Sequence, residues 1–153
     1  MPTLTQNLLV STDFSPASML AIDAASLLAQ AFGAKVTLAH VFDPAPLAPM
    51  PTSQLGSAEQ LEVEQAYERR LHAELERLRD EKLAGLADVK VALILGKNAA
   101  DSLCRYAEKE NVDLIVIATH GRTGLARMLI GSVAERVVRH AGCPVLTLRS
   151  RLE

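Results

Sequence analysis

The sequence predicts an α/β fold with a single doubly wound, five-stranded parallel sheet, helices on both faces and strand order 3-2-1-4-5. Short apolar runs alternate with helical stretches along the 153 residues. Strands separated by helices form right-handed parallel crossovers. The run Leu114–Ile117 is continuously apolar, as is typical of a strand buried on both faces at the centre of a parallel sheet. We expect one domain over residues 1–153.

The first third of the chain is predicted to contain strands at Leu8–Val10 and Lys35–Val41, separated by a helix. Ser15 is a good N-cap, and Pro16 suits the first helical position because its missing N–H costs nothing there. Gly33 ends the helix. Apolar residues recur inside it at helical spacing, at Leu20, Ala24, Leu27, Leu28 and Ala31.

The next segment, Asp43–Gly56, is predicted to be a loop because its four prolines lack the N–H donor that helices and sheets need. A long charged helix follows, from about Ala58 to Ala84. Its apolar face is predicted to consist of Val63, Tyr67, Leu71, Leu75 and Leu78.

The rest of the chain again alternates strands and helices, and Asn98 is the predicted N-cap of the first of these helices. In order, the expected elements are a strand at Val89–Leu95, a helix from Asn98 to about Lys109, a strand at Val112–Thr119, a loop at Arg122–Ile130, a helix at Ser132–Ala141 and a strand at Val145–Leu148.

Composition excludes several function classes. The net charge of −2 and an aromatic content of 3% do not support a nucleic-acid partner. No stretch approaches the roughly 18 apolar residues of a membrane span. Cys104 and Cys143 lack metal-ligand spacing and are expected to be two reduced thiols packed as small hydrophobes, which predicts a cytoplasmic protein without a bound metal.

Ligands of such sheets bind beyond the carboxyl ends of the strands, where the strand order reverses. After the first strand stands Asp13, whose carboxylate accepts hydrogen bonds and therefore suits a ribose hydroxyl better than a phosphate. After the fourth strand stands a loop with Gly121 and Gly131, followed by Ser132 at a helix start. Unpaired N–H groups and the helix dipole favour a phosphate there.

Each of these residues also has a structural interpretation. Ser132 and Glu135 form a Ser-x-x-Glu capping box, which explains Ser132 without a ligand and is compatible with one. Gly121 and Gly131 could be turn glycines. Asp13 could bond its own backbone in a turn.

Three charged or titratable loop residues leave alternatives open. His120 could act as a general base, but a single histidine without a partner carboxylate more often orients its loop. Arg122 could reach a phosphate or remain solvated, and the same holds for Arg127.

At these residues the sequence resembles the universal stress protein family. Its nucleotide-binding members carry Gly-x2-Gly-x9-Gly-Ser/Thr, and this chain reads Ala118-x2-Gly121-x9-Gly131-Ser132. The similarity spans essentially the whole chain and includes the segments Val10–Ser15, Ala39–Val41 and Cys143–Leu146. Ala118 replaces the first glycine of the motif. Its methyl group is harmless if its φ is negative and unfavourable if φ is positive.

The resemblance implies ATP or ADP as ligand, with Mg²⁺ held through the phosphates. Asp13 would hold the ribose, the main chain of Val41 would face the adenine, and the glycine loop would hold the phosphates. The candidate nucleotide contacts are Thr12, Asp13, Val41, Ala118, His120, Gly121, Arg122, Gly131, Ser132 and Val133. The resemblance also implies a homodimer through the last strand, Pro144–Leu148.

The favoured function is an ATP- or ADP-responsive regulator in stress survival, in which nucleotide orders the Arg122–Ile130 loop. One alternative is an interaction protein of the same fold that binds no nucleotide, which Ala118 favours. Another is a slow ATPase. No catalytic residue is assigned, and at most weak ATP hydrolysis is expected, because the chain shows no positioned base near the phosphates.

Overall fold

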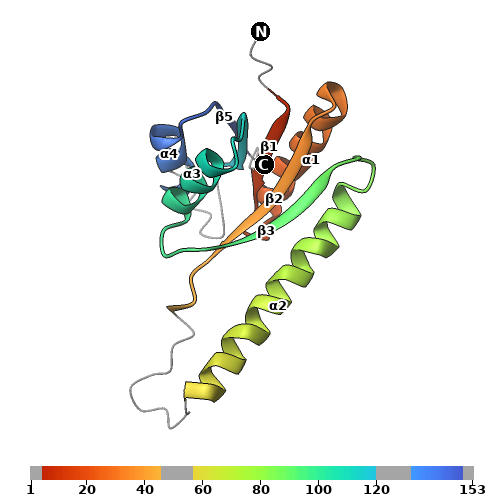
Figure 1. Ribbon diagram of the computed structural model, residues 1–153. Helices are drawn as coiled ribbons and strands as arrows, with labels where there is room; N and C mark the ends of the chain where they lie inside the picture. Colours follow the sequence, from red (N-terminus) through yellow and green to blue (C-terminus); the bar gives the residue numbers. More distant parts are fainter. Residues whose placement is uncertain (1–4, 46–56, 120–131, 150–153) are drawn as a thin grey trace.

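The computed structural model describes residues 5–45, 57–119 and 132–149 and has one parallel sheet with strand order β3-β2-β1-β4-β5 (Figure 1). The strands are β1 (Asn7–Ser11), β2 (Lys35–Phe42), β3 (Val89–Leu95), β4 (Leu114–Ala118) and β5 (Val145–Leu148). The helices are α1 (Pro16–Phe32), α2 (Ser57–Lys82), α3 (Ala99–Lys109) and α4 (Ser132–His140). The predicted fold class and strand order are confirmed.

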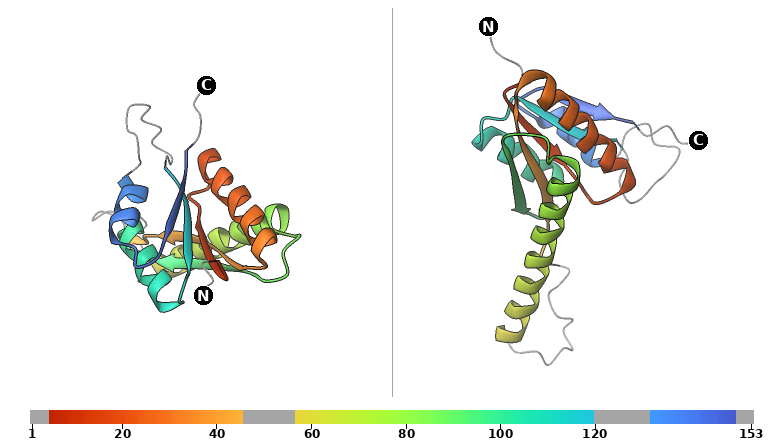
Figure 2. Two further views of the ribbon diagram at one scale, coloured as in Figure 1. Left: turned by 90° about the horizontal axis from the view of Figure 1, so that it is seen from above. Right: turned by 90° about the vertical axis from the view of Figure 1, so that its right-hand side faces the viewer.

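The sheet lies between two helical layers, with α1 and α2 on one face and α3 and α4 on the other (Figure 2). Each layer covers its own apolar cluster. Leu8 and Val10 of β1 belong to the cluster under α1 and α2. Leu9 belongs to the cluster under α3 and α4. Successive residues of a strand point to opposite faces, which explains why a central strand is apolar at every position.

Local capping defines the helix ends as the sequence predicts. The Ser15 hydroxyl accepts the N–H of Ser18 (3.3 Å) at the start of α1. Gly33 ends α1 with a left-handed φ of 65°, and its N–H donates to the Ala29 carbonyl. The Asn98 side chain accepts the N–H of Asp101 (3.1 Å) and caps α3.

The buried face of α1 agrees only in part with the predicted apolar residues, of which Ala24 and Leu28 are partly buried against the core. Its buried apolar residues are Ala21, Ile22, Ala25 and Ala29. Leu20 and Leu27 are 42% and 68% exposed. Because α1 is apolar nearly all round, helical periodicity does not select a face. The small alanines let the helix backbone approach the sheet closely, and the larger leucines remain outside.

The predicted apolar face of α2 is only half buried. Leu71, Leu75 and Leu78 lie in the core, but Val63 and Tyr67 are 50% and 38% exposed. Figure 1 shows that the first turns of α2 extend beyond the strands. The Tyr67 ring still contacts Phe42, the last residue of β2, with ring centroids 5.2 Å apart. The helix is longer than the sheet it packs against.

Within the described residues, no helix is long and apolar enough to cross a membrane.

Strand β4 is shorter than predicted because the residues before it close the turn from α3. The N–H of Val112 donates to the Ala107 carbonyl at the end of that helix. The Asp113 carboxylate accepts the N–H groups of Gln6 (3.0 Å) and Asn7 (2.9 Å). These contacts attach the amino end of β4 to the amino end of β1.

Both cysteines are free thiols, as expected, and pack half-buried against the cluster under α3 and α4. Burial raises the pKa of Cys104 and of Cys143 above the ordinary thiol value. They are accordingly protonated, apolar packing groups at neutral pH.

Candidate functional site

The carboxyl ends of β1 and β4 lie side by side, at the point where the strand order reverses. These strands pair in parallel from Leu8 with Leu114 to Val10 with Val116. Helix α4 ends shortly before β5 begins, at the opposite edge of the sheet, and therefore starts at this carboxyl edge. The turn after β1, the end of β4 and the start of α4 therefore all lie at this edge of the sheet. This is the expected ligand position in an open α/β sheet.

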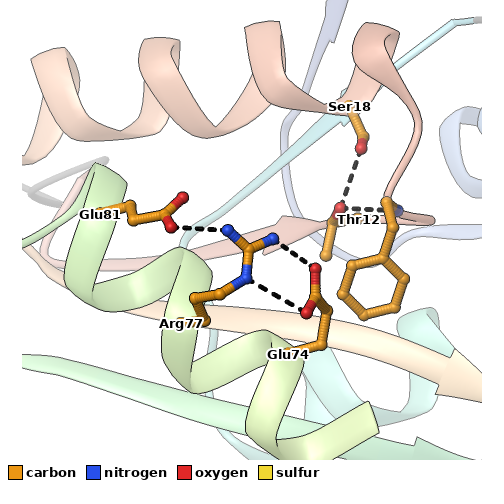
Figure 3. A network of polar contacts seen from close by, with 6 residues as sticks. Thr12, Ser18, Glu74, Arg77 and Glu81 are labelled. Carbon is orange, nitrogen blue, oxygen red and sulfur yellow. Dashed lines mark hydrogen bonds and ion pairs between the residues drawn. The ribbon is translucent and has the colours of Figure 1, made fainter.

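The turn after β1 is held by its own side chains. Thr12 is only 2% exposed, and its hydroxyl accepts the N–H of Phe14 (3.0 Å) and lies 2.8 Å from the Ser18 hydroxyl of α1 (Figure 3). Asp13 is half-buried and accepts the N–H of Ser15 (3.0 Å) through Oδ1. The side chain of Thr12 therefore fixes the turn to the helix, and the carboxylate of Asp13 lies at the exposed edge.

Asp13 makes the predicted turn contact, because its Oδ1 accepts the N–H of Ser15. An ionised carboxylate has about four acceptor positions, so a turn contact does not by itself exclude a ligand contact. The turn and ligand interpretations of Asp13 are compatible.

Val41 lies in the part of β2 that extends past the end of β1. The last paired residues of the two strands are Ser11 and Ala39, and the N–H of Thr12 donates to the Ala39 carbonyl (2.9 Å). Backbone polar groups alternate between the two neighbours of a strand. The Phe42 carbonyl accepts the N–H of Gly96 on the β3 side. The N–H and C=O of Val41 consequently point to the other side, where β1 has ended.

Ala118 is the last residue of β4 and pairs with Leu148 of β5. Its φ is not positive, because the positive-φ residues other than glycine in the described ranges are Phe14 and Asn111. Its methyl group packs against the cluster under α1 and α2. Alanine at this motif position therefore causes no backbone strain. The next residue, Thr119, is 4% exposed and is a buried polar residue that the sequence did not single out.

Ser132 and Val133 form the exposed start of α4. A helix of this length has unpaired N–H groups and a partial positive charge at its first turn. Glu135 is ion-paired with Arg139 one turn further on (2.7 Å), and both side chains are well exposed. The arrangement offers an anion several backbone donors at the carboxyl edge.

The remaining predicted contacts, His120, Gly121, Arg122 and Gly131, lie outside the described residues, as does the Arg122–Ile130 loop. The described part of the site therefore consists of the turn after β1, Val41, the end of β4 and the start of α4. Among the described residues there is no group of three or more His, Cys, Asp or Glu side chains that could hold a metal ion.

A second hollow lies at the carboxyl ends of β2 and β3, beside α2. It has a volume of about 380 Å³ and is lined by Asp43, Pro44, Ala45, Glu64, Leu95, Gly96 and Lys97. Asp43 accepts the N–H of Ala45 (2.9 Å), a turn of the same kind as that of Asp13. No pattern in the sequence predicts this hollow, because it depends on how α2 lies against the sheet edge.

Comparison with known proteins identifies relatives over nearly the whole chain. Residues 5–149 match the family model described as the universal stress protein family. A universal stress protein of Methanocaldococcus jannaschii is 35% identical over 147 residues, covering 95% of this chain and 83% of the relative.

Solved structures also resemble this chain over nearly its whole length. The hypothetical protein MJ0577 superimposes with a TM-score of 0.82 at 25% identity, covering 98% of this chain and 99% of that one. A universal stress protein solved in complex with cAMP gives a TM-score of 0.67 at 28% identity, covering 94% of this chain and 95% of that one.

Proposed function

Because the chain belongs to the universal stress protein family, we propose that it binds an adenine nucleotide, ATP or ADP, at the carboxyl edge between β1 and β4. In this proposal, binding makes the protein a nucleotide-responsive regulator in stress survival. The related structure solved with cAMP supports an adenine nucleotide as the ligand class.

The observation that carries the proposal is the orientation of the Val41 main chain. Val41 belongs to β2, and its N–H and C=O point to the space beyond the end of β1. A strand residue presents one N–H donor beside one C=O acceptor. Adenine has a ring-nitrogen acceptor next to its N6 amino donor and can pair with both, whereas guanine carries a carbonyl oxygen in place of that amino group. The orientation of Val41 toward the space beyond Ser11 thus favours adenine over guanine.

The sugar and phosphates follow from the neighbouring groups. The Asp13 carboxylate lies in the turn directly after β1 and can accept hydrogen bonds from hydroxyl groups, as a ribose requires. The exposed first turn of α4 suits the phosphates. Since the described residues supply no acidic cluster, Mg²⁺ would be held through the phosphates rather than by a set of protein ligands.

Titration calorimetry with ATP, ADP and GTP tests this proposal. We expect saturable binding of ATP or ADP and at least tenfold weaker binding of GTP. Asp13→Asn keeps the turn acceptor but removes the charge, and should weaken ATP binding about tenfold or more, since hydrogen bonds to charged groups contribute about 1.5–3 kcal/mol.

Asp43→Asn is the matched control, because Asp43 makes the same turn contact at the second hollow. It should leave ATP affinity unchanged. Absence of ATP and ADP binding at millimolar concentration would favour the alternative of an interaction protein without a nucleotide. Loss of ATP binding in Asp43→Asn but not in Asp13→Asn would indicate that the nucleotide binds at the second hollow.

We also propose that the protein is a cytoplasmic homodimer that pairs through β5. In the described sheet, β5 is an edge strand bonded to β4 on one side, and Leu146 is 37% exposed. An edge strand can continue its sheet with a second copy. Sedimentation equilibrium should give twice the monomer mass, and Leu146→Lys should shift it toward monomer.

A further inference from the structure

The residue after Asp13 adopts an unusual backbone conformation. Phe14 has a φ of 63°, in the left-handed region that favours glycine and asparagine and is rare for a bulky aromatic residue. Such conformations persist only where the surrounding structure enforces them, and they concentrate at functional positions. The contacts that enforce the positive φ of Phe14 therefore indicate which part of the turn must be kept in place.

Those contacts converge on His40 of β2, which lies 28 residues after Thr12. Its Nδ1 lies 2.8 Å from the carbonyl oxygen of Thr12. Because a carbonyl only accepts, Nδ1 carries the hydrogen in this bond. The His40 ring also packs against the Phe14 ring, with centroids 4.6 Å apart and planes tilted by 48°. One side chain of β2 thus contacts the residue before Asp13 and the residue after it.

The rest of the turn is fixed from the other side. The Phe14 N–H donates to the Thr12 hydroxyl (3.0 Å), and the Ser15 N–H donates to Asp13 Oδ1 (3.0 Å). Two local hydrogen bonds and the two contacts of His40 therefore hold the backbone on both sides of Asp13, which restricts the carboxylate.

We propose that His40 and Phe14 are positioning residues that hold the Asp13 carboxylate ready for the ribose hydroxyls. This inference rests on the proposed function, since it assigns ribose recognition to Asp13. His40 acts through Asp13. Its removal should weaken the hydroxyl contacts of the nucleotide and leave the contacts of the base and the phosphates in place.

The test compares ATP with 2′,3′-dideoxy-ATP by calorimetry. The wild-type protein should bind ATP about tenfold or more tightly than the dideoxy analogue. His40→Leu should reduce this preference to within about threefold, with the affinity for the dideoxy analogue unchanged. His40→Asn should restore most of the preference, because its amide can place an N–H donor near the position of Nδ1.

Two further variants complete the comparison. Phe14→Gly accepts the positive φ without a ring and should lose part of the preference. If His40→Leu fails to fold, the preference of Phe14→Gly for ATP over the dideoxy analogue tests the positioning role instead. His72→Leu is the control, because His72 is exposed on α2 and its nearest acidic partner is Glu76, at 3.8 Å. It should leave both affinities unchanged.

A loss of affinity that is equal for both nucleotides would show a merely structural role for His40 and overturn the inference. An unchanged preference in His40→Leu would overturn it as well.

Amide hydrogen exchange separates this inference from the proposed function. In the ligand-free protein, His40→Leu should speed exchange at Phe14 and Ser15 about tenfold or more while the β4 amides remain protected. Wild-type protein that binds neither nucleotide would refute the proposed function. Unchanged exchange at Phe14 and Ser15 would refute the positioning role in either case.

Discussion

Gly96, directly after β3, lies so close to Ser102 of α3 that a side chain would not fit there without a shift. A Cβ added at Gly96 would lie 2.0 Å from the Ser102 hydroxyl oxygen and 3.1 Å from the Ser102 Cβ. Ser102 is 3% exposed, and its hydroxyl is buried without a hydrogen-bond partner. Gly96 does not have a positive φ. Alanine would therefore be unfavourable there through overlap alone.

The magnitude follows from the two distances. The hydroxyl can rotate away, but the 3.1 Å contact between the two Cβ atoms stays and requires the start of α3 to shift. Overpacking of this kind costs about 1–3 kcal/mol, and we expect about 2 kcal/mol for Gly96→Ala. Ser102→Ala alone should be neutral or stabilising by up to about 1 kcal/mol, because it removes a buried, unpaired hydroxyl.

A double-mutant cycle measured by urea unfolding tests the reasoning. In the Ser102→Ala background, Gly96→Ala should cost about 1 kcal/mol, because only the contact between the Cβ atoms remains. Gly85→Ala is the control, since nothing lies within 4 Å of its added Cβ, and it should be neutral or slightly stabilising. An equal cost of Gly96→Ala in both backgrounds, or no cost in either, would refute the assignment.

The remaining predictions concern the turn after β1 and the cysteines. Thr12→Val keeps the shape of the side chain but removes the acceptor of the Phe14 N–H, and should lower the free energy of unfolding by about 1–3 kcal/mol; a urea midpoint unchanged from wild type would contradict this. Because burial raises the pKa of Cys104 and of Cys143, less thiolate is present at pH 8 than in a free cysteine, so iodoacetamide should modify the native protein several-fold more slowly than the urea-unfolded chain. Equal native and unfolded rates, followed by mass spectrometry, would count against it.

Features that depend on a few neighbouring residues could be predicted from the sequence. Ser15, Gly33 and Asn98 all cap helices as expected, because capping involves residues within one turn of the helix end. The bounds of β3 and β5 also agree with the predicted ranges. In both cases, a short apolar run is bounded by residues that end a strand.

Features set by packing between elements could not be predicted. An alanine-rich helix does not specify which side it buries, and the exposed Leu20 and Leu27 show the result in α1. The burial of Tyr67 depends on how far the sheet reaches along α2. Neither quantity is encoded in a local pattern.

The candidate site likewise combines features that the sequence predicts with features that depend on packing between elements. The position of Asp13 after the first strand could be predicted, because the carboxyl ends of parallel strands share one edge. The availability of the Val41 main chain depends on β1 ending three residues before β2 does, which requires the register of pairing. The positive φ of Phe14 depends on a contact with His40 that is distant in sequence.

We propose that an adenine nucleotide binds with its base on the main chain of Val41. A titration of ¹⁵N-labelled protein with ATP, followed by amide chemical shifts, tests it directly. We expect saturable shifts at Val41, Asp13 and Ser132, and a smaller Val41 shift when GTP replaces ATP. Saturable shifts confined to Leu95 and Lys97 at the second hollow, with Val41 unmoved, would contradict it.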